Sequence, residues 1–519
     1  MKDLPHKVRF ERYRDDALIA KCERYAHWTL PYLMADPDRN PTGMQVPVER
    51  DYQEMGALLT NNLATKLAAL LFPVNVPFFE ATPSQKLIED AKQRGIDETT
   101  LRSELANLTT AACKRVFNNG GYAQIVSAVR HLIVTGNVLL RRVPEDQTYI
   151  AYGLQHYSTR RDGMGRVMDT ILRERADFET LPPDVQKELR RVNPGKYRRA
   201  KPDCVVELYT RIHRKYGKTG KAYWEVTQQA DNIDVGTPGT YPEHLCPYMV
   251  LTWNHTVGEH YGRGLVEDYA GGFAKLSDGS EAAMLYGIEI LRVLHLVEPG
   301  LGADIDEVAT AESGEWVQGS SGSVTAYEAG DFQKLQAIRA ELQEVVQNLS
   351  RAFMWRGNTR DAERVTAYEI RQDAQEADNS LGGVYSTLAQ VWQVPTAHQL
   401  IHEERPELLA GLLTSSVKLN VVTGVPALGR NADIQTLLSA TQEAAAIVPA
   451  LTQLDDRVDS HKVFDLVMSR SNIDIKSLFL DEEALAAKRA AQQQQAEGMQ
   501  QMLGAEAGID AAQGLQTLS

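Results

Sequence analysis

The sequence predicts an α+β fold that is mainly helical. Over most of the 519 residues, apolar side chains recur at steps of three and four, the period of an amphipathic helix. Alternation with a period of two is confined to residues 147–253, where turn dipeptides also gather. Two long helical stripes, at 265–291 and 332–353, flank one acidic stretch. These three patterns indicate a helical chain with a small antiparallel sheet, organised around a pair of long helices.

The first 146 residues are predicted to be helical until one strand begins. Pro31 ends the first helical pattern, and Phe72-Pro73 ends the second. Gly136-Asn137 then turns the chain into the apolar run Val138-Leu-Leu140, which we expect to be a strand. The predicted helices cover 8–30, 53–71, 84–117 with breaks, and 122–135.

Residues 147–253 are predicted to form the small antiparallel sheet. Asp162-Gly163 separates two alternating segments. The turn residues at 215–221 join 205–213 to 222–227 as a hairpin. A short helix is expected at 183–191, with Pro183 in its first turn.

The two long stripes are predicted to be struts, at 261–297 and 332–354, that carry the insert 298–331 at their far end. The insert holds eight acidic residues, six glycines and no Lys or Arg. Amphipathic helices most often bury an ordinary core, and a charge run is most often a solvated face. The acidity of this insert favours instead a compact, negatively charged tip.

Glycines interrupt the helical stripes at three places. They are Gly271-Gly272, Asp278-Gly279 and Gly382-Gly383. Each glycine costs a helix up to about 1 kcal/mol relative to alanine. Their presence therefore predicts either a close approach of another helix or a bend.

After the second strut comes a polar break at 355–363 that contains two arginines. A third helical stripe then runs from Ile370 to Val391, and Pro395 is expected to stop it. Beyond Pro395 the sequence predicts helices at 397–403 and 406–413, a strand at 418–422, and helices at 434–448 and 462–468. From residue 484 the chain is rich in Ala and Gln, as in a surface helix or a disordered tail.

Composition limits the classes of function. A chain of this length ordinarily holds two to four domains. The net charge of −14 argues against a protein that grips nucleic acid over a broad surface. The four cysteines have no paired spacing, so we expect neither a disulfide framework nor a zinc site. We expect instead a reducing, intracellular origin. No signal peptide and no membrane span are expected.

The sequence offers no defensible catalytic site. Gly217-Lys218-Thr219 resembles the end of a phosphate-binding loop, but Ile212 stands where that motif needs glycine. His402 lacks the second histidine that zinc peptidases place one helical turn further on. We therefore expect no enzyme activity, no cofactor and no metal ion.

An ordered set of short stretches resembles one protein family. They are Asn61-Asn-Leu-Ala-Thr-Lys-Leu67 with Leu71-Phe-Pro73, Gly136-Asn-Val-Leu-Leu140, Gly239-Thr-Tyr-Pro242 with Cys246-Pro-Tyr248, Tyr261-Gly-Arg263, Glu363-Arg-Val-Thr-Ala367, and Leu381-Gly-Gly-Val-Tyr-Ser386. In this order the chain resembles the portal, or head-to-tail connector, proteins of short-tailed bacteriophages of the T-odd coliphage type. One such stretch is weak evidence, whereas the ordered set is strong.

The resemblance implies a portal fold with wing, stem, clip and crown, assembled as a ring of twelve identical subunits. It implies a wing at 1–260, stem helices at 261–297 and 332–354, a clip at 298–331, a tunnel loop at 355–363, a long kinked helix at 364–395, wing return and crown at 396–483, and a tail at 484–519.

The resemblance also implies partners and sites. The ring would stand at one capsid vertex of the virion, after assembly in the host cytoplasm, and would conduct double-stranded genome DNA during packaging and ejection. Terminase and then a tail adaptor would dock on the clip, and capsid, scaffolding and internal core proteins would be neighbours. The alternative is a helical scaffold or adaptor protein without a pore.

Particular residues are expected to serve these roles. The DNA contacts in the tunnel loop are predicted at Arg356, Asn358, Arg360 and Arg364, although the arginines could instead pair with Asp361 or Glu363. The helix kink is predicted at Gly382 and Gly383. The docking residues of the clip are predicted to be Asp304, Asp306, Glu307, Glu312, Glu315 and Trp316, where Trp316 either anchors a partner or packs inside the clip.

Overall fold

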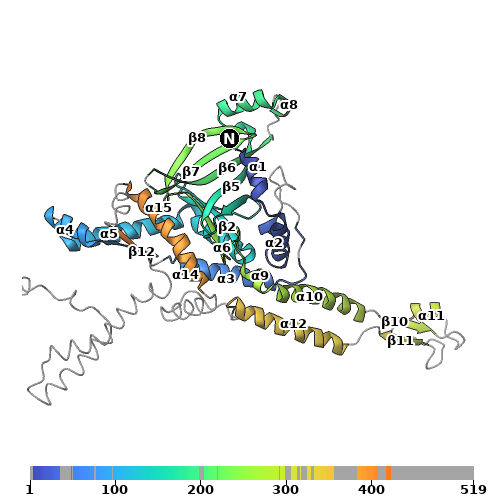
Figure 1. Cartoon of the computed structure of the whole chain (residues 1–519). Coiled ribbons are helices and arrows are strands. Elements are labelled where there is room, and N and C mark those ends of the chain that lie inside the picture. The colour runs from blue at the N-terminus through green and yellow to red at the C-terminus, as the bar shows by residue number, and fades with distance from the viewer. Residues whose placement is uncertain are drawn as a thin grey trace, which may run out of the picture. The chain divides into compact units, whose positions relative to one another are not determined.

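The structure, a computed structural model, describes residues 4–35, 48–49, 51–74, 77–95, 97–197, 204–218, 220–291, 293–297, 305–312, 316, 324–328, 332–355, 383–406 and 417–421. The chain divides into two compact units, 1–427 and 428–519, and all of these residues belong to the first. The predicted α+β class with mainly helical elements is confirmed (Figure 1).

The N-terminal segment forms two helices where the sequence predicted one. Arg14 is extended, with ψ of 135°, and Asp15 caps the second helix by accepting the Leu18 N–H at 3.0 Å. Such a cap satisfies a donor that the helix start leaves free, and it fixes the break there. The helices are α1 (His6–Tyr13) and α2 (Asp16–Trp28), followed by a 3₁₀ turn (Pro31–Met34) and α3 (Met55–Leu71).

The predicted helical stretch 84–117 has the expected breaks. Asn119 and Gly120 adopt left-handed φ values of 46° and 76° and separate this stretch from the next helix. Gly136, with φ of 75°, then ends that helix as the sequence predicted. The elements are α4 (Gln85–Gln93), α5 (Glu98–Lys114), a 3₁₀ segment (Arg115–Gly120) and α6 (Gly121–Thr135).

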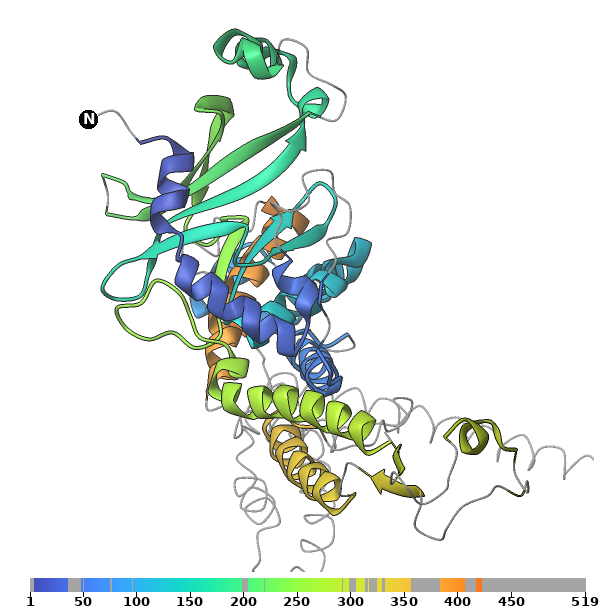
Figure 2. The ribbon, with the colours of Figure 1, turned by 90° about the vertical axis from the view of Figure 1, so that its right-hand side faces the viewer.

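The predicted antiparallel region forms two sheets. A three-stranded sheet has the order β3 (Thr148–Tyr152), β2 (Asn137–Val143), β9 (Tyr248–Thr252). A five-stranded antiparallel sheet has the order β4 (Tyr157–Arg161), β5 (Val167–Asp177), β6 (Val205–Tyr216), β7 (Ala222–Ala230), β8 (Ile233–Pro242). The predicted hairpin is β6–β7, and the short helix is α7 (Pro183–Val192), followed by α8 (Pro194–Tyr197). Helix α1 lies against β4, β5 and β6 (Figure 2).

Helix α15 (Val394–Glu404) contradicts the prediction that Pro395 stops the third helical stripe. The helical path runs through α14 (Val384–Leu388) and a π-helical turn (Ala389–Gln393) directly into α15. Pro395 follows the π-helical turn after Val394, and this irregularity of the helix suits a residue without a backbone N–H. Strand β12 (Val417–Val421) then pairs with the distant β1 (Phe79–Pro83) in an antiparallel ladder.

Buried polar contacts hold α15 against the N-terminal elements. The guanidinium of Arg142 on β2 is 1% exposed and donates two hydrogen bonds to Glu403, at 2.8 and 2.7 Å. Arg115 donates to Glu404 at 2.6 Å. Because a buried charge left without its partner is costly, the buried Arg142–Glu403 pair fixes the position of α15 on β2, and the partly buried Arg115–Glu404 pair adds to it.

The predicted struts form an antiparallel helix pair. They are α10 (Ala270–Ile290), preceded by the short α9 (Leu265–Asp268), and α12 (Phe332–Ala352). The first strut is shorter than its predicted range of 261–297, because Val293–Val297 forms strand β10. This strand pairs with β11 (Val324–Glu328), and α11 (Ile305–Thr310) lies between them in the chain.

Candidate docking and channel site

Helices α10 and α12 lie side by side (Figures 1 and 2), and glycines of α10 that face leucines of α12 let them pack closely. A Cβ placed on Gly272 would lie 3.2 Å from Leu349 Cδ2, and one on Gly279 would lie 2.6 Å from Leu342 Cδ2. The two glycines are seven residues apart on α10, and the two leucines are seven residues apart on α12. The two contacts therefore lie on the same face of each helix. Helix α10 is continuous through these glycines. Of the two alternatives that the sequence left open, close helix approach is therefore confirmed for α10.

The end of the helix pair nearest the sheets is anchored by aromatic rings. Phe273 and Phe353 are both fully buried and meet edge to face, with ring centroids 5.5 Å apart. Tyr269 also meets Phe353 edge to face, at 6.0 Å. Such pairs add about 0.5–1.5 kcal/mol beyond the burial of their area. This end of the helix pair is therefore part of the main core.

The far half of the helix pair leaves apolar side chains uncovered. Leu291 is 81% exposed, at the end of α10. The others lie on the last turns of α10 or at the start of α12, and they are Met284, Leu285, Ile288 and Phe332. We call these five residues the distal apolar face. Contiguous apolar side chains of this kind mark interaction surfaces in soluble proteins.

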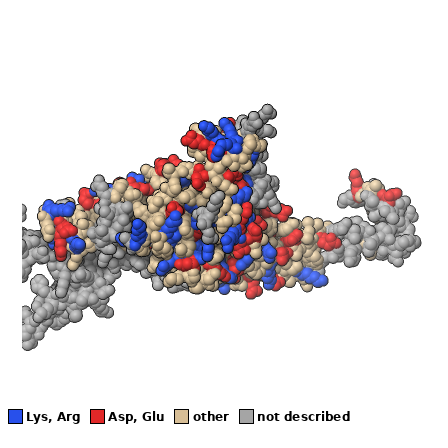
Figure 3. Space-filling model, turned by 45° about the horizontal axis from the view of Figure 1, so that its top comes forward, with Lys and Arg blue, Asp and Glu red and all other residues tan. Residues whose placement is uncertain are grey.

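Two strands that the sequence did not predict pair with each other here: β10 at the end of the predicted first strut and β11 in the predicted clip. The short run Val293–Val297, apolar except for His295, was the local signal for β10, and it adjoined a helical stripe. Asp306, Glu307 and Glu312 are exposed, and in Figure 3 the described atoms around α11 are acidic or uncharged. Trp316 is 98% exposed, so it does not pack inside this tip. Asp304 and Glu315 lie outside the described residues.

The C-terminal end of α12 has a left-handed cap made without glycine. Met354 has φ of 55°, and the Trp355 N–H donates to Ser350 O at 2.8 Å, which is the pattern of a Schellman motif. Lys66 of α3 donates through Nζ to Met354 O at 2.8 Å. This cap defines where the chain leaves the helix pair and enters the predicted tunnel loop.

The predicted DNA contacts, Arg356, Asn358, Arg360 and Arg364, lie outside the described residues, as does Gly382. Gly383 has φ of 85° and directly precedes α14. A left-handed φ suits glycine, so a change of chain direction there is compatible with its identity.

The described residues contain no group of three His, Cys, Asp or Glu side chains arranged to hold a metal ion. Within the same part of the chain, none of the helices is both long enough and apolar enough to span a bilayer. Cys22, Cys113, Cys204 and Cys246 are all free thiols.

Comparison with known sequences assigns the family. The family model of the bacteriophage head to tail connecting protein matches residues 9–478. The chain therefore belongs to this family, has the role of a phage portal protein, and is a structural component of the virion. The family resemblance predicted from the ordered motifs is thus confirmed.

Three portal proteins illustrate the relationship. The chain is 42% identical over 487 residues to the portal protein of Pseudomonas phage phiKMV, covering 94% of each sequence. It is 33% identical over 425 residues to that of Enterobacteria phage SP6, covering 82% of this chain and 79% of the other. It is 29% identical over 500 residues to that of Escherichia phage T7, covering 94% and 90%. Among solved structures it is similar to a chain in the neck of a native gene transfer agent particle computed with C12 symmetry, with 12% identity, a TM-score of 0.35, and coverage of 86% of this chain and 92% of that one.

Proposed function

We propose that copies of this chain close into a ring, of twelve subunits, whose axial hole conducts double-stranded genome DNA during packaging and ejection. The observation that carries this proposal is the distal apolar face on the helix pair. Its side chains lie on the glycine-packed helix pair, and they stay exposed among the residues that the structure describes. A neighbouring helix pair would bury them, at roughly 25 cal/mol for each Å² of apolar surface removed from water.

A ring requires that one patch on a subunit meets a different patch on the next. Parallel helix pairs placed side by side around an axis meet this requirement, and they enclose a hole. Negative-stain imaging of the purified full-length protein tests the proposal. Annular particles with an axial hole are expected, whereas monomers or open filaments would favour a scaffold protein without a pore.

The charge of the chain suits a channel through which DNA slides. Each Lys or Arg that neutralises a phosphate strengthens binding, and a ring repeats it in every subunit. A subunit with a net charge of −14 therefore holds DNA weakly. The proposed contacts are Arg356, Asn358, Arg360 and Arg364, which would touch the phosphate backbone without reading bases. The double variant Arg356→Ala/Arg360→Ala should still form rings but change DNA packaging or retention. Unchanged packaging and retention would contradict these contacts.

The acidic tip is proposed as the docking end for terminase and later for the tail adaptor. Its exposed Asp306, Glu307 and Glu312 suit a partner surface rich in Lys and Arg. Trp316, at 98% exposure, is proposed as the apolar anchor, because interfaces favour tryptophan. In this arrangement the ring stands at the portal vertex of the virion, next to capsid, scaffolding and internal core proteins, after assembly in the host cytoplasm.

A further inference from the structure

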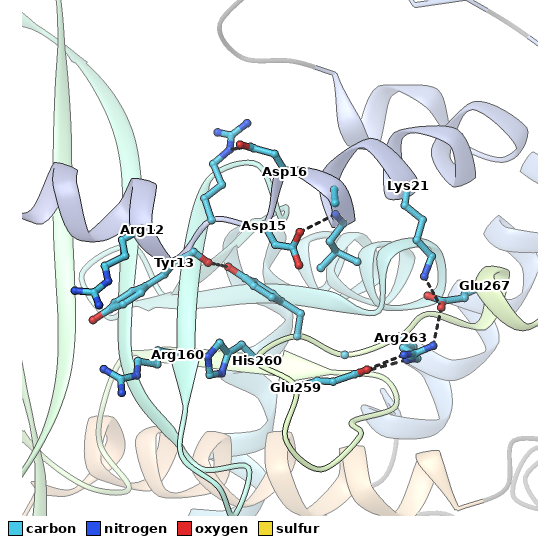
Figure 4. A pocket seen from close by; sticks show the side chains of 15 residues that line it. Arg12, Tyr13, Asp15, Asp16, Lys21, Arg160, Glu259, His260, Arg263 and Glu267 are labelled. Carbon is cyan, nitrogen blue, oxygen red and sulfur yellow. Dashed lines mark hydrogen bonds and ion pairs between the residues drawn. The ribbon is translucent and has the colours of Figure 1, made fainter.

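A cavity of about 810 Å³ opens at residues 259–267, which directly precede the helix pair in the chain (Figure 4). Its walls come from three separate segments. They are the α1–α2 junction with the first turns of α2, the end of β4 at Arg160, and residues 259–267, which lead into α9. The last of these contains Tyr261-Gly-Arg263, one of the stretches that carried the family resemblance.

The floor of this pocket is rigid. The Tyr261 hydroxyl donates to Tyr13 O at 2.8 Å and accepts the Thr159 N–H at 3.2 Å, which joins the three walls. Gly262 has no room for a side chain, because a Cβ there would lie 2.7 Å from Thr252 Cβ and 2.9 Å from Asn254 O. The pocket is therefore a preformed feature of the subunit.

One side of the pocket is closed by its own ion pairs. Glu267 accepts from Lys21 at 2.5 Å and from Arg263 at 3.1 Å, and Arg263 also contacts Glu259 at 2.6 Å. Burial is the largest single influence and lowers the pKa of Lys21, but the hydrogen bond to Glu267 and the charge of Glu267, with Tyr25, together leave the pKa raised. Lys21 therefore keeps its charge, and these four residues satisfy one another.

The other side presents guanidinium groups that face solvent. Arg14 pairs with Asp16 at 2.7 Å, but the exposed side chains of Arg12 and Arg160 have no hydrogen bond or ion pair with any of the described residues. His260 accepts the Arg161 N–H through Nδ1 at 3.2 Å, which leaves its Nε2 as a donor. Figure 4 shows Arg12, Arg160 and His260 on the side away from the Lys21–Glu267–Arg263 chain. A ligand for this side must bring hydrogen-bond acceptors with negative charge.

The remaining lining residues favour a ligand that is a carboxylate on a polypeptide, and they disfavour nucleic acid. Asp15, Asp16 and Glu259 also line the pocket. They would repel the successive phosphates of a nucleic acid backbone. A polypeptide can instead place one Asp or Glu between the two arginines and offer backbone N–H groups to the acidic residues.

We propose that this pocket receives an acidic segment of a neighbouring copy of this chain, with its carboxylate bound by Arg12 and Arg160. The inference rests on the proposed ring. A head-to-tail contact needs a receptor on one subunit and a different, complementary segment on the next, and a preformed pocket with unpaired donors is such a receptor. A chain with a net charge of −14 supplies many acidic segments.

The first test compares two charge reversals in the full-length protein. Arg12→Glu/Arg160→Glu changes the pocket, and Arg24→Glu/Lys187→Glu makes the same charge change at exposed positions outside it. Sedimentation velocity measures the protein concentration at which half of the subunits are in rings. For the pocket variant this concentration should be about tenfold higher than for the wild type, because a close attractive charge pair has become repulsive. The control variant should match the wild type. Circular dichroism and thermal unfolding verify that both variants fold.

The second test identifies the occupant. A photo-reactive amino acid replaces Arg160 in rings mixed from isotopically light and heavy subunits, and mass spectrometry identifies the cross-linked peptides. Links between light and heavy subunits at an Asp- or Glu-containing peptide are expected. The proposal is overturned if such links are absent, if the pocket reversal assembles like the wild type, or if it only weakens binding of duplex DNA. If the wild type forms no rings at all, the proposed function fails as well, so the two failures are distinguishable.

Discussion

Gly279 of α10 faces Leu342 of α12 so closely that a Cβ on the glycine would lie 2.6 Å from Leu342 Cδ2. The glycine weakens the helix by up to about 1 kcal/mol relative to alanine. In return the two helices come together along a narrow seam.

Filling this seam should destabilise the helix pair. Gly279→Val places two methyl groups against Leu342, whereas Gly271→Val places them where nothing lies within 4 Å. Both variants introduce the same β-branched residue into the same helix. Gly279→Val should therefore lose about 1–3 kcal/mol more in its free energy of unfolding, measured by urea denaturation.

The double variant Gly279→Val/Leu342→Ala completes the comparison. It should recover part of the loss, because the smaller side chain makes room for the valine. Equal stability of Gly279→Val and Gly271→Val would contradict the close packing.

The cap of α12 predicts an unusual preference for glycine. Met354 is 5% exposed and has φ of 55°. Any smaller residue at this position loses apolar burial, but only glycine also relieves the strain of the left-handed backbone. Met354→Ala and Met354→Gly lose nearly the same burial. We expect Met354→Gly to be more stable than Met354→Ala by about 1 kcal/mol in thermal unfolding. If Met354→Ala is the more stable variant, the cap is not left-handed in solution.

His131 predicts a pH dependence of stability. Burial, with a smaller contribution from His156, lowers its pKa from 6.5 to about 4. Between these values the unfolded chain binds a proton that the folded chain excludes, so stability falls as the pH falls through this window. The loss from this one group is about 3 kcal/mol.

The variant His131→Leu isolates that group. Its free energy of unfolding should fall less than that of the wild type between pH 7 and pH 4, when both are measured by urea denaturation. A wild-type and a variant curve with the same slope would show that His131 titrates normally in the folded protein.

The acidic tip predicts docking that depends on salt. Asp306→Lys/Glu307→Lys should weaken binding of the tail adaptor to purified rings by about tenfold or more, because rim charges govern association at low salt. Glu89→Lys/Asp90→Lys, on exposed positions of α4, is the matched control and should bind normally. Wild-type binding should weaken as NaCl rises from about 0.1 M to 1 M, since screening shortens from about 10 Å to 3 Å. Adaptor affinity that does not change with NaCl concentration, or that falls equally in the control variant, would contradict electrostatic docking at the tip.

The sequence predicted local elements well where a period persists over several turns. The stripe from Phe332 to Phe353 predicted α12 to within one residue. The hairpin β10–β11 was missed because Val293–Val297 adjoins a helical stripe, and its partner strand follows only at Val324. A run of five residues that is apolar except for His295 is too short to be distinguished from the end of a helical stripe.

Pairings between distant segments were not predictable from local patterns. Strand β1 pairs with β12, which lies more than 300 residues later in the chain. The local pattern of neither strand indicates which other strand it pairs with. The π-helical turn before Pro395 depends on packing, since Gln393 donates from a fully buried position to Leu71 O. The pocket at Arg12 and Arg160 was also missed, because its walls come from three segments that only the fold brings together.

The most direct measurement is a cryo-electron microscopy map of the purified ring, with residues 355–363 traced in every subunit. We predict a closed annulus in which this segment faces the axial hole, wide enough for a DNA duplex. An assembly that does not close, or a closed ring with residues 355–363 on its outer wall, would contradict the account.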